Sequence, residues 1–286
     1  MGIDGGAFKE DKEEGHMIVQ DLGELRGDFL IFGGPYSNAQ ASTALIDAAR
    51  AHGIVPENCI CTGDVVAYCA DPVATLALIR GFGGPVVAGN CERQLAQDAP
   101  DCGCGFEQGR ACDLLSLGWY GYADARVGAP DRAWMAALPD LITFAHQARR
   151  YAVIHGGARD ISRFLWPVSP AEVFAQEIAV IEQAVGPVDV VLAGHCGLAF
   201  ARDIGRHRWI NAGVIGMPPH DGRAQTRYAV ISGQGVVFHR LGYDVDGAAA
   251  AMEAVGLTQG YHTALRRGIW PSEDVLPAGM RRAVEA

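Results

Sequence analysis

The sequence predicts an α/β fold in which one domain contains two β-sheets, and two observations indicate it. In the first half of the chain, short apolar runs alternate with segments of helical spacing, which favours parallel strands with helices on their faces. After residue 140, apolar runs follow one another closely, which is typical of paired strands. No linker and no internal repeat separates the halves, so we expect a single domain.

The elements of the first half follow from local patterns. Residues 29–32 are apolar and are followed by two glycines, which predicts a buried strand that enters a turn. Residues 39–52 are rich in Ala and Leu at helical spacing, and Gly53 is a typical helix stop. The other expected elements are strands at 58–62 and 85–88, a helix at 72–80 that has Pro at its first turn, and a short helix at 131–138.

The second half is richer in strands. Strands are expected at 141–145, 150–154, 188–192, 209–210, 228–231 and 236–241, with an amphipathic helix at 170–185 and two terminal helices near 247–255 and 261–267. We therefore predict a folded domain over residues 17–243 and a C-terminal helical extension over 244–286 that packs on it. Residues 1–16 are polar and Gly-rich, so we expect a disordered tail or a vector remnant there.

Composition limits the classes of function. The chain has 49% hydrophobic residues and a formal net charge of −10, so it can bury a large core while its surface repels polyanions. Binding to duplex nucleic acid is therefore not expected. No apolar stretch approaches the roughly 20 residues of a membrane span, and no apolar signal core begins the chain. We expect a cytoplasmic protein without a membrane partner.

The eight cysteines are expected to be reduced thiols, since a long chain without a secretion signal rarely uses a disulfide framework. Four of them form a tighter group, at Cys91, Cys102, Cys104 and Cys112. Their spacing matches no common zinc pattern. A metal or cluster site there and ordinary loop cysteines are both left open.

Short polar islands follow several apolar runs, and these carry the functional signal. They are Gly63-Asp64, Gly89-Asn90-Cys91-Glu92, His155-Gly156-Gly157, Gly194-His195-Cys196 and the stretch from Asn211 to Gly216. Carboxylate and amide oxygens combined with two imidazole nitrogens make a typical ligand set for a divalent transition metal. The sequence thus indicates a metal site at the strand ends.

In this order, the islands resemble those of the calcineurin-like metallophosphoesterases, particularly the YfcE-type phosphodiesterases and their diadenosine-tetraphosphatase-like relatives. That family carries Asp-x-His, Gly-Asp, Gly-Asn-His-Asp/Glu, His-Gly and Gly-His-x-His. The resemblance spans about residues 29–241 and is densest over 62–72. It implies two packed mixed β-sheets flanked by helices, with the active site at the strand ends.

The resemblance also implies a ligand set. One metal would be held by Asp64, Asn90, His155 and His195. The ligands of the family's second metal would come from positions that are Gly34, Tyr36 and Gly197 here, so only Asp64 is left for it. We therefore expect one site for Mn, Fe, Zn or Ni, and the second site lacks its ligands.

Further residues are candidates for catalysis and substrate binding. Cys91 stands where the family has a histidine that is often proposed to protonate the leaving group, and Glu92 fills the acidic position that orients this residue. Either Cys91 is a catalytic thiol or it is a neutral filler. Tyr36 either binds phosphate or fills the space of the lost metal, and Arg159 is a candidate contact for an anionic substrate, as is Asn90.

These features predict a metal-dependent phosphoesterase that hydrolyses a phosphomonoester or phosphodiester by metal-activated water. The alternative is a catalytically inactive metal- or phosphate-binding regulatory module, which the missing second set of ligands favours. The expected partner is a small phosphorylated substrate, with nucleotides among the candidates, and the sequence leaves a homo-oligomer open.

Overall fold

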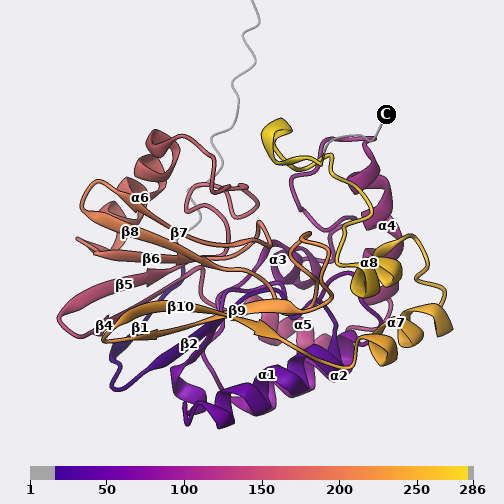
Figure 1. The fold of residues 1–286 in the computed structure, drawn as a ribbon, viewed down its shortest axis with the longest axis horizontal. Coiled ribbons are helices and arrows are strands. Elements are labelled where there is room, and N and C mark those ends of the chain that lie inside the picture. The colour runs from indigo at the N-terminus through magenta and orange to yellow at the C-terminus, as the bar shows by residue number, and fades with distance from the viewer. Residues whose placement is uncertain (1–16, 283–286) are drawn as a thin grey trace, which may run out of the picture.

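The computed structural model describes residues 17–282 (Figure 1). The predicted tail over residues 1–16 lies outside the described residues. The described chain forms two mixed β-sheets with helices around them, which confirms the predicted fold class.

The larger sheet has six strands in the order β1-β4-β5-β6-β8-β7. Its β4 and β5 pair antiparallel, whereas β5, β6 and β8 run parallel to one another. The strands are β1 (Val19–Glu24), β4 (Leu141–His146), β5 (Arg149–Val153), β6 (Val190–Ala193), β7 (Ala199–Ile204) and β8 (His207–Ala212).

The smaller sheet has four strands in the order β10-β9-β2-β3, and it joins distant parts of the chain. Its members are β2 (Phe29–Phe32), β3 (Cys59–Cys61), β9 (Thr226–Ser232) and β10 (Gly235–Leu241). The strands β2 and β3 are parallel, and β2 also pairs antiparallel with β9. The predicted halves are therefore interleaved, because the first strands of the chain share a sheet with the last ones.

Apolar side chains explain the stacking of the layers. Phe29 and Ile31 of β2 pack against Ile142 and Phe144 of β4 in a core between the two sheets. Because neighbouring residues of a strand point to opposite faces, Leu30 and Phe32 belong instead to a second core beneath the helices. The strand β2 is thus buried on both faces.

Helices cover the outer faces of both sheets, as Figure 1 shows. The helix α6 (Ala171–Val185) buries Phe174, Ile178 and Ile181 in a core with residues of the six-stranded sheet. The other helices are α1 (Ala39–Ala51), α2 (Pro72–Phe82), α3 (Asn90–Ala96), α4 (Ala111–Asp124), α5 (Ala129–Ala136), α7 (Val245–Ala254) and α8 (Tyr261–Arg267). None of the helices in the described part of the chain is long and apolar enough to cross a membrane.

Four elements were not anticipated from the sequence: β1, β7, α3 and α4. The side chains of β1 are mostly exposed, so this edge strand lacks the apolar pattern that reveals a buried one. The strand expected at 85–88 is only an isolated bridge between Cys61 and Val86. The terminal helices were expected, and they bury Ala249, Met252 and Leu265 in the core that also contains residues of α1.

Candidate metal centre and its cavity

The predicted ligands come from both sheets and meet where the strands end. Asp64 follows β3 of the small sheet, while His155 and His195 follow β5 and β6 of the large sheet. Asn90 is the first residue of α3. Because the carboxyl ends of parallel strands lie at one edge of a sheet, the fold brings these loops together.

Glycines allow the loops to approach closely. A Cβ atom at Gly63 would lie 2.6 Å from the backbone nitrogen of Gly89, and one at Gly194 would collide with Thr62. The ligand residues also have unusual backbones, since φ is +57° at Asp64 and +63° at His195. Such conformations are costly for residues with a side chain and are commonly found at functional sites.

His155 lies at the centre of the group. Its Nδ1 is 2.6 Å from the carbonyl oxygen of Thr62, which fixes Nδ1 as the donor. In the neutral imidazole the other nitrogen, Nε2, carries the lone pair, and it lies 3.1 Å from His195 Nδ1, 3.1 Å from Asn90 Oδ1 and 3.3 Å from Asp64 Oδ2. Asn90 is held in this orientation because its Nδ2 donates to the carbonyl oxygen of Cys102 at 2.8 Å.

This arrangement fits a cation. Electron pairs of His155, Asn90 and Asp64 point into one small volume, and the ligand atoms of Asp64, His155 and His195 all lie within 4.8 Å of one another. Tetrahedral sites with bonds of about 2.0–2.1 Å separate their ligands by roughly 3.3 Å, close to the distances from His155 Nε2. The structure thus brings together all four predicted ligands, and their role as ligands stays a prediction.

The ionisation of Asp64 and His195 is consistent with this fit, whereas a cation has to compete with a proton for Nε2 of His155. Burial opposes a charge on His155, but the Asp64 carboxylate and the Thr62 carbonyl outweigh it and raise its pKa. Burial and the neighbouring His155 lower the pKa of His195 to about 3, so His195 is neutral. Burial disfavours the Asp64 carboxylate, yet His155 lowers its pKa overall. A neutral imidazole and a carboxylate are the forms that bind metals.

The Glu92 side chain fixes the backbone of the loop that contains Asp64. Its carboxylate is fully buried and accepts hydrogen bonds from the backbone N–H groups of Asp64 at 2.7 Å, Val65 at 2.8 Å, Val66 at 3.3 Å and Gly89 at 2.9 Å. Burial and Asp64 raise its pKa to about 7, while the backbone donors favour the ionised form. These contacts support a positioning role, and a direct catalytic role for Glu92 stays a prediction.

Cys91 lies beside Asp64 but does not line the cavity described below. Its backbone N–H donates to Asp64 Oδ1 at 3.2 Å. Burial, followed by Asp64 and Glu92, raises the pKa of its thiol well above the usual value. The thiol is therefore protonated at neutral pH and is a weak acid, so its predicted role as a proton donor gains no support from its surroundings.

Aromatic residues pack around the positions at which the resemblance placed the second set of metal ligands. A Cβ atom at Gly34 would lie 2.5 Å from Cζ of Tyr36 and 2.7 Å from Cγ1 of Val214. One at Gly197 would lie 3.4 Å from the Trp270 ring. The Tyr36 side chain thus occupies space that a longer residue at position 34 would need, which supports its interpretation as a filler. Its contact with substrate stays a prediction.

We expect Gly34→Ala to destabilise the protein more than an equivalent change elsewhere, because the new methyl group must displace Tyr36 or Val214. Overpacking of this kind costs about 1–3 kcal/mol. Gly53→Ala is the control, since Gly53 also has a positive φ (+67°) but a Cβ atom there would meet no atom within 4 Å. Urea unfolding of both variants measures the difference, and equal losses would contradict the filled space at Gly34.

A mainly apolar cavity of about 60 Å³ adjoins the candidate ligands. Asp64 and His195 reach it, and its walls include Phe164, Trp166 and Trp270. A second cavity of about 220 Å³ shares Phe106, Phe164 and Trp166 with it. Trp166 and Trp270 thus belong to the apolar packing and also face the cavity.

The C-terminal segment closes one side of this cavity. The Trp270 indole donates to the carbonyl oxygen of Pro218 at 2.7 Å, and the Trp270 backbone N–H donates to His220 Nδ1 at 2.8 Å. This wall was not anticipated from the sequence, because a tryptophan far along the chain carries no local sign of the site that it covers. Arg159, by contrast, is exposed and is not among the residues that line the cavity.

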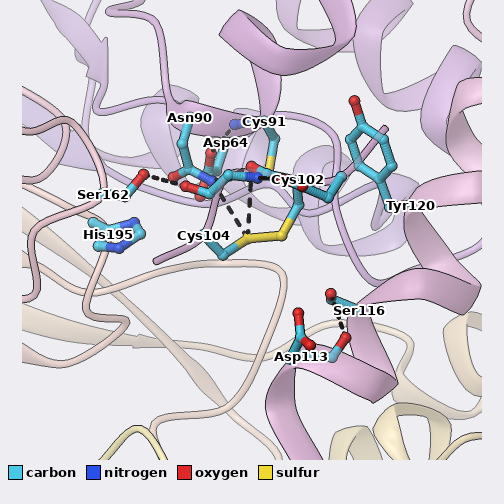
Figure 2. The surroundings of a disulfide bond; sticks show 12 residues. Asp64, Asn90, Cys91, Cys102, Cys104, Asp113, Ser116, Tyr120, Ser162 and His195 are labelled. Carbon is cyan, nitrogen blue, oxygen red and sulfur yellow. Dashed lines mark hydrogen bonds between the residues drawn. A yellow bond between two sulfur atoms is a disulfide. The ribbon is translucent and has the colours of Figure 1, made fainter. Parts of the chain in front are cut away.

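The expectation of reduced cysteines is wrong for one pair. Cys102 and Cys104 form a disulfide beside Asn90, as Figure 2 shows. The other six cysteines are free and buried. No pattern in the sequence indicates this bond, since spacing alone cannot establish a pairing.

The chain matches the family model of the calcineurin-like phosphoesterase superfamily domain over residues 37–234. Among solved structures, it is similar to a metallophosphoesterase from Sphaerobacter thermophilus (20% identity, TM-score 0.64, 86% of this chain and 100% of that one). It is also similar to a hypothetical protein from Pyrococcus horikoshii OT3 (15% identity, TM-score 0.69, 84% and 98%). YfcE, a phosphoesterase from E. coli, matches at 12% identity and a TM-score of 0.40, over 75% of this chain and 100% of that one. No curated protein has a matching sequence.

Proposed function

Because the chain belongs to the calcineurin-like phosphoesterase superfamily, we propose that it is a phosphoesterase that works with one divalent metal and hydrolyses a phosphomonoester or phosphodiester. The observation that carries the proposal is the convergence of Asp64, Asn90 and His195 on the lone pair of His155. The histidine centre is limited to one cation, because the positions expected to hold the ligands of the second metal are Gly34, Tyr36 and Gly197.

Asp64, Asn90, His155 and His195 would hold the cation, for which Mn²⁺, Fe²⁺, Zn²⁺ and Ni²⁺ are the candidates. When bound, such an ion polarises a phosphoryl group and acidifies water. The chain itself supplies the orientation of the ligands, through the Thr62 carbonyl and the Glu92 carboxylate. Glycine and tyrosine at the second ligand positions supply neither a carboxylate nor an imidazole.

The residues that line the cavity indicate which kind of organic group the phosphate ester contains. No Lys or Arg is among the described residues that line it, so the negative charge of a phosphate would be balanced by the cation alone. The aromatic walls suit an apolar or aromatic organic group, which loses contact with water there. The proposed substrate is therefore a small phosphorylated molecule that carries a planar ring, with nucleotides among the candidates.

A pair of substrates tests this preference without changing the leaving-group chemistry. We expect the kcat/KM for 2-phenylethyl phosphate to be about 10-fold or more above that for ethyl phosphate. Burial of the ring stabilises the bound ester by about 1–3 kcal/mol. The assay uses the purified chain loaded with each candidate metal, together with the corresponding diesters. Phe164→Ala should reduce the preference, whereas Phe238→Ala, distant from the cavity lining, should retain it. Equal rates for both esters would contradict the role of the aromatic walls.

The loss of the second ligand set favours one alternative, a module that binds a metal or phosphate without turnover. The same assay separates the two functions. Metal-dependent hydrolysis that exceeds that of Asp64→Ala supports the enzyme. If the protein binds one metal ion per chain but hydrolyses no ester, the binding module is the correct function.

A further inference from the structure

Two cysteine sulfur atoms contact the side chain of Asn90, and a third is bonded to one of them. Asn90 Nδ2 lies 3.3 Å from the Sγ of Cys104 and 3.5 Å from the Sγ of Cys91, in addition to its bond to the Cys102 carbonyl. Cys91, Cys102 and Cys104 are 1%, 3% and 6% exposed. Figure 2 shows the disulfide near Asn90, Cys91 and Asp64.

The Asp64 carboxylate faces both this sulfur group and the histidines. Its Oδ2 is 3.3 Å from His155 Nε2, whereas its Oδ1 accepts from the Cys91 backbone N–H at 3.2 Å. One carboxylate therefore adjoins two sets of metal-binding atoms, one rich in nitrogen and oxygen and the other in sulfur.

The disulfide itself adds little to the stability of the fold. It joins residues only two positions apart, and cross-links that close so short a loop restrict the unfolded chain least. Its effect is therefore local, on the position of Cys102, Cys104 and the Asn90 amide that they contact. A single hydrogen-bond acceptor would be enough to orient the Asn90 amide. A group of three buried cysteines there therefore calls for another explanation.

We propose that Cys91, Cys102 and Cys104 form, once the disulfide is reduced, a thiolate site for Zn²⁺ or a similarly soft divalent cation, with Asp64 as the oxygen ligand shared with the histidine centre. Three thiolates and one carboxylate match the tetrahedral coordination and the ligand types of zinc. The site would lie next to the Asp64 carboxylate, and Cys104 also lines the cavity that Tyr36 and Trp270 border. It does not depend on phosphoesterase activity.

The chemistry balances with a dithiol as the reductant. The dithiol transfers two electrons and two protons to the Cys102–Cys104 bond, yields two thiols and becomes a disulfide itself. Binding of the cation then releases one proton from each thiol that becomes a ligand. Oxidation by a disulfide reverses the first step and removes two of the ligands.

Metal stoichiometry with and without reduction tests the site. The full chain is stripped of metal, divided into an oxidised and a dithiol-reduced sample, freed of reductant and dialysed anaerobically against Zn²⁺ or Co²⁺. We expect the reduced sample to bind about one more ion per chain, and its Co²⁺ form to show a thiolate-to-cobalt charge-transfer band. Equal stoichiometry with no such band in the reduced sample would overturn the proposal.

Variants assign the extra ion to its ligands. Cys104→Ser should lose the extra ion and the band, while Cys59→Ser, which changes a buried cysteine in β3, should keep both. His155→Ala should lose the other ion and keep the charge-transfer band, which separates this site from the proposed phosphoesterase centre. In the wild type, Zn²⁺ should protect Cys91, Cys102 and Cys104 from alkylation as read by peptide mass spectrometry. A band that persists in Cys104→Ser, or thiols alkylated equally with and without Zn²⁺, would contradict the assignment.

Discussion

His155→Ala is expected to abolish retention of the metal at the histidine centre and, with it, metal-dependent hydrolysis. The imidazole Nε2 is the atom on which Asp64, Asn90 and His195 converge, so its removal takes away a ligand and the element that orders the others. The loss of an outer hydrogen-bond partner alone weakens metal affinity by about 10–100-fold. We therefore expect more than about 100-fold weaker binding by titration calorimetry.

His146→Ala is the matched control for that experiment. His146 is also a buried histidine of the large sheet, but its Nε2 pairs with the carbonyl oxygen of Gly27 at 2.8 Å, away from the site. This variant should lose stability and yet keep its metal, as measured by elemental analysis after dialysis. Unchanged metal in His155→Ala, measured in reduced and in oxidised protein, would exclude the proposed centre.

Glu92→Ala is expected to cause the largest loss of stability among single substitutions at the site. Truncation leaves four buried backbone N–H donors without an acceptor, at Asp64, Val65, Val66 and Gly89. Each stranded donor costs about 1–3 kcal/mol, so the loss should reach at least about 4 kcal/mol. This amount is a large part of the stability of an ordinary domain.

Two further variants sharpen this result, with urea unfolding as the measurement. Glu92→Gln keeps one acceptor oxygen and should fall between the wild type and Glu92→Ala. Glu172→Ala removes an exposed carboxylate in the first turn of α6 and should change the free energy of unfolding by less than about 0.5 kcal/mol. A loss below about 1 kcal/mol for Glu92→Ala would show that the Asp64 loop holds its shape without this carboxylate.

Much of the fold was predictable because its elements have strong local patterns. The buried strand β2 is a continuous apolar run, and α6 has helical spacing throughout. The edge strand β1 has no such pattern, since its side chains face water and its partner β4 lies more than a hundred residues away. Likewise, only pairing in space shows that β2 and β9 belong to one sheet.

The candidate ligands were also predictable, because each is a polar residue that ends an apolar run and their order matches the family pattern. The distances between these residues, and the hydrogen bonds that orient them, could not be predicted from the sequence. The hydrogen bond that fixes the His155 tautomer joins residues 93 positions apart, and the one that orients Asn90 depends on a loop whose path no local rule determines.

The sequence by itself determined which candidate metal ligands the chain contains, Asp64, Asn90, His155 and His195, and which expected positions hold none, Gly34, Tyr36 and Gly197. The tertiary structure alone decided what surrounds these positions: the Tyr36 ring packs against Gly34, the Trp270 ring against Gly197, and the Cys102–Cys104 pair lies beside Asn90. The reason is physical. The chemistry of a side chain is carried by its own residue, whereas the space that it fills depends on which distant segments pack against it, and the long-range contacts of the whole chain set that.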